Sequence, residues 1–132
     1  MNKDKWAVTL RLGEREKLED RVVRIVECLA EVYPNAQWNI EDIDATGEIG
    51  GNLAQNFHEL QYTHLSSSEL LNILSEDGQV IELLATMMDQ DEKLFRIIIR
   101  DGISVDVLGT GDLLSASCLG PFDTLTVELF GW

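Results

Sequence analysis

The sequence has no lysine or arginine between Arg24 and Lys93, although this segment is more than half of the 132-residue chain. The formal net charge is −14, and the excess comes from this segment because the flanking parts offset one another. A field of one sign lowers stability through self-repulsion and is commonly kept for solubility or for steering a cationic partner. The charge pattern therefore indicates a protein that binds something basic. The fourteen carboxylates of the segment are Glu27, Glu31, Glu41, Asp42, Asp44, Glu48, Glu59, Glu69, Glu76, Asp77, Glu82, Asp89, Asp91 and Glu92.

Long apolar runs are also missing. No stretch approaches the ~18–20 apolar residues of a membrane span, and Met1–Trp6 lacks the apolar core of a signal peptide. Cysteine is scarce, with Cys28 on the apolar side of a predicted helix and Cys118 in a late loop. We expect a buried, reduced thiol for at least Cys28 rather than a disulfide. These absences predict a cytoplasmic protein that does not act at a membrane.

The remaining composition is that of a folded protein. Hydrophobic residues make up 45% of the chain, which is too many for a disordered acidic tail. A chain of this length buries roughly two-thirds of its unfolded surface as one domain. We therefore expect a single domain over residues 1–132.

The first half of the chain predicts a strand, a helix and a second strand. Trp6–Leu12 alternates apolar and polar residues, which is the period of a half-buried strand. A helical apolar stripe runs from Leu18 to Tyr33, and Glu14 and Glu16 are expected to open this helix. Ala36–Ile40 is the second predicted strand. Residues 42–56, rich in Gly, Asn and Asp, are expected to form a loop, and a short helix near 53–60 is left open.

The second half predicts a helix and several strands. Ser66 and Glu69 have the spacing of a capping box, so a helix is expected over 67–75. Val80–Met88 fits a helical stripe as well as a strand, and we prefer the strand because residues 95–108 form a hairpin that needs a neighbour. Asp101-Gly102 suits the tight turn of this hairpin. With a last strand over 125–130, the sequence predicts an α+β domain: a largely antiparallel sheet with helices packed on one face.

Motifs for metals and catalysis are incomplete. Asp42–Ile49 has the first positions of a calcium-binding loop, but Leu53 stands where the closing bidentate glutamate should be. His58 and His64 are six residues apart rather than the four of the zinc-protease motif. Ser66–Ser68 caps a helix, and Cys118 has no basic neighbour in sequence to activate it. We therefore expect no enzyme activity, no metal and no cofactor.

Direct nucleic-acid binding is disfavoured as well. Phosphate contacts need Lys and Arg, and here these residues are interleaved with carboxylates. Arg15, Lys17, Arg21 and Arg24 form the main candidate basic helix face. Because Glu19 and Glu27 can pair with them at helical spacing, a solvated, salt-bridged surface is the expected structure.

The predicted partner is therefore a basic protein, most plausibly a nuclease whose cleft holds phosphates with Lys and Arg. An acidic face speeds encounter with such a protein, and an apolar anchor slows release. The candidate anchor is Trp38, although an inward-facing core position explains this residue equally well. The predicted partner-binding residues are Trp38, Glu41, Asp42, Asp44, Glu48 and Glu59.

In size, charge and expected architecture the whole chain resembles the immunity proteins of bacterial polymorphic-toxin and contact-dependent growth inhibition systems. These are small, acidic, cytosolic α+β proteins, each paired with a secreted toxin. The resemblance includes no shared motif, so no site residue is carried over. It implies an inhibitor of a toxin domain.

Two alternative functions stay open. The first uses the acidic surface, and the second does not. An inhibitor that mimics DNA would carry carboxylates in two rows at phosphate-like spacing along an elongated face. A small enzyme or ligand-binding subunit would instead need a deep apolar pocket with His58 or His64 beside a carboxylate.

Overall fold

The computed structural model describes residues 4–52 and 63–127, which form a seven-stranded sheet in the order β3-β2-β4-β5-β6-β1-β7. Every neighbouring pair of strands is antiparallel. The expected α+β architecture is confirmed. The elements are β1 (Lys5–Leu10), α1 (Leu18–Val32), β2 (Gln37–Ala45), a helical segment over 47–52, β3 (Thr63–Ser66), α3 (Ser67–Leu74), β4 (Val80–Asp89), β5 (Glu92–Arg100), β6 (Ser104–Thr110), α4 (Ala116–Leu119) and β7 (Phe122–Leu125).

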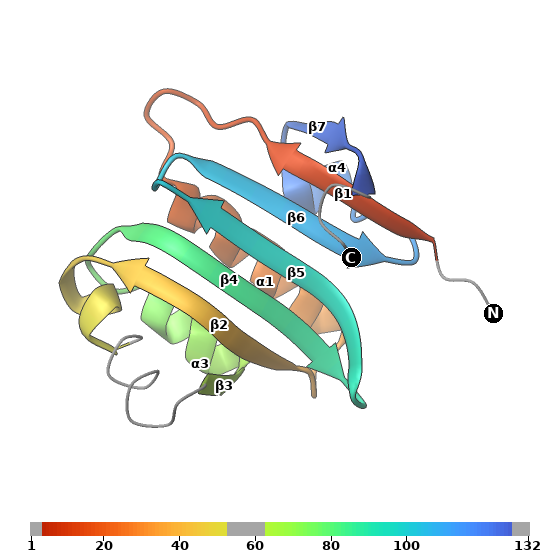
Figure 1. The fold of residues 1–132 in the computed structure, drawn as a ribbon, viewed down its shortest axis with the longest axis horizontal. Coiled ribbons are helices and arrows are strands. Elements are labelled where there is room, and N and C mark those ends of the chain that lie inside the picture. Colours follow the sequence, from red (N-terminus) through yellow and green to blue (C-terminus); the bar gives the residue numbers. More distant parts are fainter. Residues whose placement is uncertain (1–3, 53–62, 128–132) are drawn as a thin grey trace.

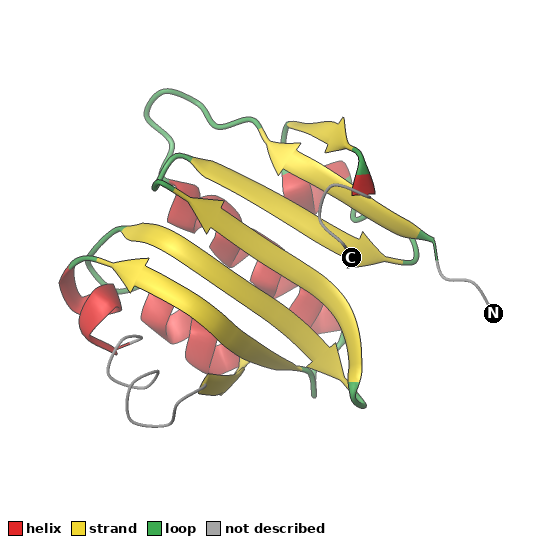
Figure 2. Ribbon diagram, viewed as in Figure 1, coloured by secondary structure: helices red, strands yellow, loops and turns green. Residues whose placement is uncertain are grey.

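The helices α1 and α3 lie on the same face of the sheet (Figures 1 and 2). The apolar stripe of α1 supplies Val22, Ile25 and Leu29 to the core, and each of these side chains is at most 1% exposed. They pack with the inward side chains of the central strands in one continuous core. We call the opposite side of the sheet, on which no described helix packs, the open face. The expectation of helices on one face is correct.

The central meander confirms the strand assignment for residues 80–88. The turn between β5 and β6 has positive φ angles at Asp101 (57°) and Gly102 (66°), as a type I′ turn requires. The turn between β4 and β5 has positive φ angles at Gln90 (50°) and Asp91 (65°), so Asp89–Glu92 is the tip of a hairpin. Short turns of this kind fix the register of three neighbouring strands.

The N-terminus of α3 has the predicted capping box. The Ser66 hydroxyl accepts a hydrogen bond from the Glu69 backbone N–H at 3.1 Å, and the Glu69 carboxylate accepts one from the Ser66 N–H at 3.1 Å. Two backbone donors at the helix start are thereby satisfied, which explains why the chain leaves β3 directly into α3.

Some predicted boundaries are wrong. The strand β2 continues to Ala45 and a helical segment covers 47–52, so neither stretch of the expected loop over 42–56 is loop. The helix α1 begins at Leu18 rather than at Glu14 or Glu16. Glu16 lies before the helix, where its carboxylate accepts a hydrogen bond from the Gly13 N–H at 3.2 Å. The last described strand is Phe122–Leu125, and residues 128–130 lie outside the described chain.

The expected reduced state of the cysteines is wrong. Cys28 in α1 and Cys118 in α4 form a disulfide with their Cα atoms 6.1 Å apart. Both residues are only half-buried, so Cys28 is not a core thiol. The two positions are 90 residues apart in the chain, and the fold alone brings them together.

No helix of the described chain has the length and apolar character that a membrane crossing requires.

Candidate binding surface at the acidic end of the sheet

Trp38 lies in the core and is not a surface anchor. Its side chain is 0% exposed, and its indole N–H donates to the Ser67 hydroxyl at 3.1 Å. The prediction of an exposed aromatic ringed by carboxylates is therefore wrong at this position. The alternative of an inward-facing tryptophan holds because Trp38 shares its face of β2 with Ile40, which is also buried.

A bulge in β2 decides which way its carboxylates face. Side chains alternate along a strand, so the inward positions of Trp38 and Ile40 would place Asp42 inward as well. The register with β4 shifts between Ile40 and Asp42, and Glu41 is the extra residue. Beyond the shift Ile43 packs against the core, whereas Asp42 and Asp44 are exposed. The bulge thus presents both aspartates on the open face.

Further carboxylates come from the loops at the same end of the sheet. Asp44 is the register partner of Glu82 on β4, and the Glu82 carboxylate accepts a hydrogen bond from the Asp101 N–H at 3.0 Å. Glu48 is exposed on the helical segment 47–52, which lies beside the start of β4 (Figure 1, left). We call this region the acidic end and define it by Asp42, Asp44, Glu48, Glu76, Asp77, Glu82 and Asp101.

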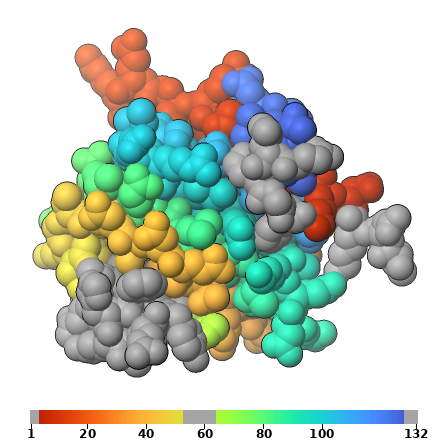
Figure 3. Space-filling view, viewed as in Figure 1, coloured from red at the N-terminus to blue at the C-terminus, as the bar shows by residue number. Residues whose placement is uncertain are grey.

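The segments of the acidic end are held together by backbone contacts. The Thr46 N–H donates to the Gln79 carbonyl at 2.8 Å, and the Ile49 N–H donates to the Asp77 carbonyl at 3.1 Å. Gly47 has a φ of +67°, and a Cβ built on it would lie 2.8 Å from the Asp77 oxygen. Only glycine permits this approach at that backbone angle without strain. In Figure 3, β2 and residues 46–52 (orange to yellow) lie beside β4 (green) on the open face.

Two arginines lie next to the acidic end, but they pair with other carboxylates. Arg96 contacts Glu41 at 3.6 Å and donates to the Thr86 hydroxyl at 3.0 Å, and Arg100 contacts Asp106 at 3.9 Å. Within the described chain, none of the seven carboxylates of the acidic end has an ion pair. Their charge is therefore not offset by a direct ion pair in the described chain. Of the predicted site residues, Glu41 pairs with arginine, whereas Asp42, Asp44 and Glu48 belong to this uncompensated group.

Both arginines line a depression of about 350 Å³ on the open face. Asp42 and Glu82 lie on its sides, and Leu84 and Ile98 contribute apolar surface. The depression borders the acidic end, so a ligand at Asp42 also meets apolar side chains.

An exposed isoleucine also lies at this end of the molecule. Ile103 follows the β5–β6 turn and is 75% exposed, the largest value among the big apolar side chains of the described residues. It lines a depression of about 510 Å³ together with Gln79, Glu19 and the loop around Gly13. An apolar side chain that is exposed in the free protein can become buried on binding, as an anchor residue does. The alternating pattern around residue 103 contains no signal that distinguishes a turn position from a buried strand position.

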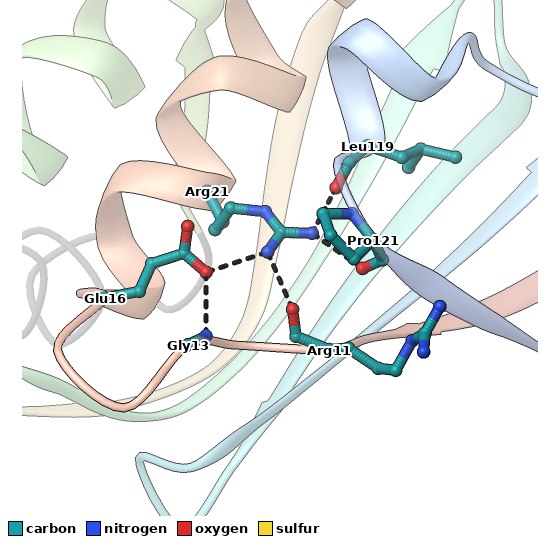
Figure 4. A network of polar contacts seen from close by, with 6 residues as sticks. All are labelled: Arg11, Gly13, Glu16, Arg21, Leu119 and Pro121. Atoms are coloured by element: carbon teal, nitrogen blue, oxygen red, sulfur yellow. Dashed lines mark hydrogen bonds and ion pairs between the residues drawn. The ribbon is translucent and has the colours of Figure 1, made fainter.

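The predicted basic helix face is not a solvated salt-bridged surface at Arg21. Its side chain is 7% exposed and bonds to Glu16 at 2.9 Å, not to Glu19 or Glu27 (Figure 4). It also donates to the carbonyls of Arg11 and Pro121, each at 2.9 Å, and to that of Leu119. These contacts tie the start of α1 to the end of β1 and to the segment after α4. The hydrogen bonds from Arg21 and from the Gly13 N–H lower the pKa of the Glu16 carboxyl.

The partial calcium-loop motif and the histidine pair of the sequence do not form a metal site in the described chain. Asp42 and Asp44 lie in a strand rather than in a calcium loop. His64 is exposed on β3 and lines neither the depression of about 510 Å³ nor that of about 350 Å³. No group of three metal-ligating side chains is present among residues 4–52 and 63–127. His58 and the predicted partner-binding residue Glu59 lie outside the described residues.

No protein-family model matches the chain, and no curated protein or solved structure matches it either.

Proposed function

We propose that the protein is an inhibitor that binds a basic protein toxin through its acidic end, in the manner of an immunity protein. The toxin would be a nuclease domain, whose phosphate-binding cleft carries Lys and Arg. The inhibitor acts in the cytoplasm by occupying that cleft. It performs no chemistry of its own and needs neither a metal nor a cofactor.

One observation carries the proposal. Seven carboxylates from five segments gather at one end of the sheet without an ion pair in the described chain. Such a field attracts a basic partner over distances near the Debye length, about 8–10 Å at physiological salt. Complementary fields raise association rates toward ~10⁸–10⁹ per molar per second, which suits an inhibitor that must act before its toxin does. Ile103 supplies the apolar contact that slows release.

The test compares two charge reversals of equal size. The chain is used as bait in lysate of its native host, with low-salt and then high-salt washes, and the captured protein is purified for stopped-flow kinetics. Asp42→Lys with Asp44→Lys reverses two exposed charges at the acidic end. Glu27→Lys with Glu31→Lys makes the same change in net charge on the exposed side of α1 and is the matched control.

We expect the captured protein to be small and basic, and to degrade RNA or DNA only in the absence of this chain. At low salt the aspartate variant should associate roughly ten-fold more slowly than the wild type, with a much smaller change for the glutamate control. The difference should shrink at high salt, because salt screens exposed charges. An unchanged on-rate of the aspartate variant at low salt would contradict the proposal. Capture of a DNA-processing enzyme would favour DNA mimicry instead.

A further inference from the structure

A small depression beside the acidic end has four carboxylates around it. It lies between the first turn of α1, the helical segment 47–52 and the loop from α3 to β4, and its volume is about 110 Å³. The carboxylates come from two of these segments, and the single lysine on its border, Lys17, makes no ion pair in the described chain. The four acidic residues are Glu19, Asp20, Glu76 and Asp77.

Glu19 is the unusual member of this group. It is 8% exposed, and its carboxylate has no hydrogen bond or ion pair in the described chain. Its place in the first turn of α1 suits a negative charge, because the positive end of the helix dipole is close. That field does not supply a donor to the carboxylate oxygens, and these oxygens still reach solvent, so they can accept from a ligand that enters the depression. Glu19 lines this depression and also the larger one that contains Ile103.

The lining of the depression is mainly polar and acidic, with a smaller apolar part. Val23, Ile49 and Leu74 supply the apolar part, and Ile49 and Leu74 are at most 3% exposed. An arginine side chain has the complementary build, with an apolar methylene stem and a charged head. Its planar guanidinium has five N–H donors that can reach carboxylates on different sides.

The size and spacing of the site agree with this occupant. A volume of about 110 Å³ is several times the ~10–15 Å³ that one water needs on the same measure, so a guanidinium fits. No three metal-ligating side chains of the described residues lie close enough to hold an ion. The site therefore suits a larger cation with several separated donors.

The walls of the depression are pre-organised. The Asn52 amide donates to the Glu76 carboxylate at 2.6 Å, and the Ile49 N–H holds the Asp77 carbonyl. Gly78 has a φ of +139°, and a Cβ built on it would lie 2.1 Å from the Thr46 oxygen. Glycine at this position therefore allows the two loops to approach closely. A site that is already ordered loses little entropy when it binds.

We infer that this depression is a socket for one arginine side chain of the basic partner, with Glu19 and Asp77 as its principal acceptors. The inference rests on the proposed function and extends it to the residue type that the partner presents. Ile103 and the larger depression that shares Glu19 would contact the partner residues next to that arginine.

The socket can be tested without the partner. Nα-acetyl-arginine amide, which carries only the guanidinium charge, is titrated into the full ¹⁵N-labelled chain and followed by NMR. Nα-acetyl-citrulline amide has the same shape without the charge, and Nα-acetyl-lysine amide tests the ammonium. Glu19→Gln and Asp77→Asn remove the proposed acceptors while keeping side-chain size. Glu27→Gln, on an exposed position of α1, is the matched control.

We expect the arginine probe to shift the amide signals of residues 17–20, 48–50 and 75–78, and to bind more tightly than the citrulline and lysine probes. Glu19→Gln and Asp77→Asn should each weaken this binding roughly ten-fold, and Glu27→Gln should leave it unchanged. The socket is refuted if citrulline binds equally well, or if arginine shifts spread evenly over all acidic segments. It is also refuted if Asp77→Asn, with its spectrum otherwise intact, binds arginine as the wild type does.

These outcomes separate the socket from the proposed function. If arginine binds here but the Asp42→Lys, Asp44→Lys variant associates normally with the captured partner, the proposed function fails and the socket stands. If arginine does not bind here while partner association depends on Asp42 and Asp44, the socket fails and the proposed function stands.

Discussion

Asp44 on β2 and Glu82 on β4 are register partners, so two carboxylates stand directly opposite each other on the open face. Like charges in this position destabilise a sheet. The Asp101 N–H donates to Glu82 and offsets part of this cost, whereas Asp44 has no ion pair in the described chain. A protein that keeps such a pair loses stability in exchange for local negative charge.

The first prediction concerns this pair. Asp44→Lys should raise the free energy of unfolding by about 0.2–1 kcal/mol, because a cross-strand ion pair with Glu82 replaces a repulsion. Urea denaturation at low and high salt measures the change, which should be smaller at high salt. Glu27→Lys makes the same charge change away from the pair and should give a smaller gain. A loss of stability in Asp44→Lys would count against the repulsion.

The second prediction concerns the tryptophan in the core. Trp38→Ala should lower the free energy of unfolding by about 3–5 kcal/mol, because the side chain is fully buried. Trp38→Phe should cost less, although it leaves the Ser67 hydroxyl without its indole donor. Chemical denaturation followed by circular dichroism gives both values. A Trp38→Phe protein that is as stable as the wild type but binds the partner weakly would restore the surface-anchor hypothesis.

The third prediction concerns the disulfide. Cys28 and Cys118 close a loop of about 90 residues, for which chain entropy gives a stabilisation of about 4–5 kcal/mol, and measured disulfides typically give about 2–4 kcal/mol. The double variant Cys28→Ser, Cys118→Ser should therefore have a lower Tm than the oxidised wild type. The reductant dithiothreitol should lower the Tm of the wild type and leave the variant unchanged. A wild type that is insensitive to the reductant, with free thiols detected beforehand, would contradict the disulfide.

The fourth prediction concerns the pH dependence of the Glu16–Arg21 contact. The pKa of Glu16 is lowered in the folded protein, mainly by the hydrogen bond from Arg21. A depressed carboxyl pKa contributes stability above the unfolded value of 4.5, and this contribution is lost as the pH falls through the folded value. Glu16→Gln should therefore be less stable than the wild type at pH 7, and the difference should begin to shrink below pH 4.5 and vanish only below the lowered folded pKa. Denaturation curves across this range measure the change. A difference that stays constant with pH would exclude the charge as its cause.

A fifth prediction follows from the space around Arg21. Gly120→Ala should be strongly destabilising, because the new Cβ would lie 2.7 Å from the Arg21 guanidinium at a φ of +68°. Gly111→Ala also falls at a positive φ, +85°, but meets no atom within 4 Å and is the control for backbone strain alone. Thermal denaturation of both variants separates the steric cost from the backbone cost. Equal losses of Tm would show that the guanidinium tolerates the methyl group.

Part of the acidic surface was accessible from the sequence. The absence of cations after Arg24 indicates an unbalanced acidic segment, and Asp42, Asp44 and Glu48 are indeed exposed there. The contributions of Glu19 and Asp101 were not accessible, because they come from distant parts of the chain. No local pattern links the first turn of a helix to the turn of a late hairpin.

The amino-acid sequence by itself determined the elements whose signals are local. The Ser66–Glu69 spacing, the Asp101-Gly102 turn and the helical apolar stripe each depend on residues within a few positions of one another, and each is present in the fold. The tertiary structure alone decided where these elements meet. It buried Trp38 under the helices, joined Cys28 to Cys118 and placed Arg21 among carbonyls from both ends of the chain. It also decided the direction of Asp42 and Asp44, because the bulge at Glu41 depends on the register with β4 and not on the period of β2.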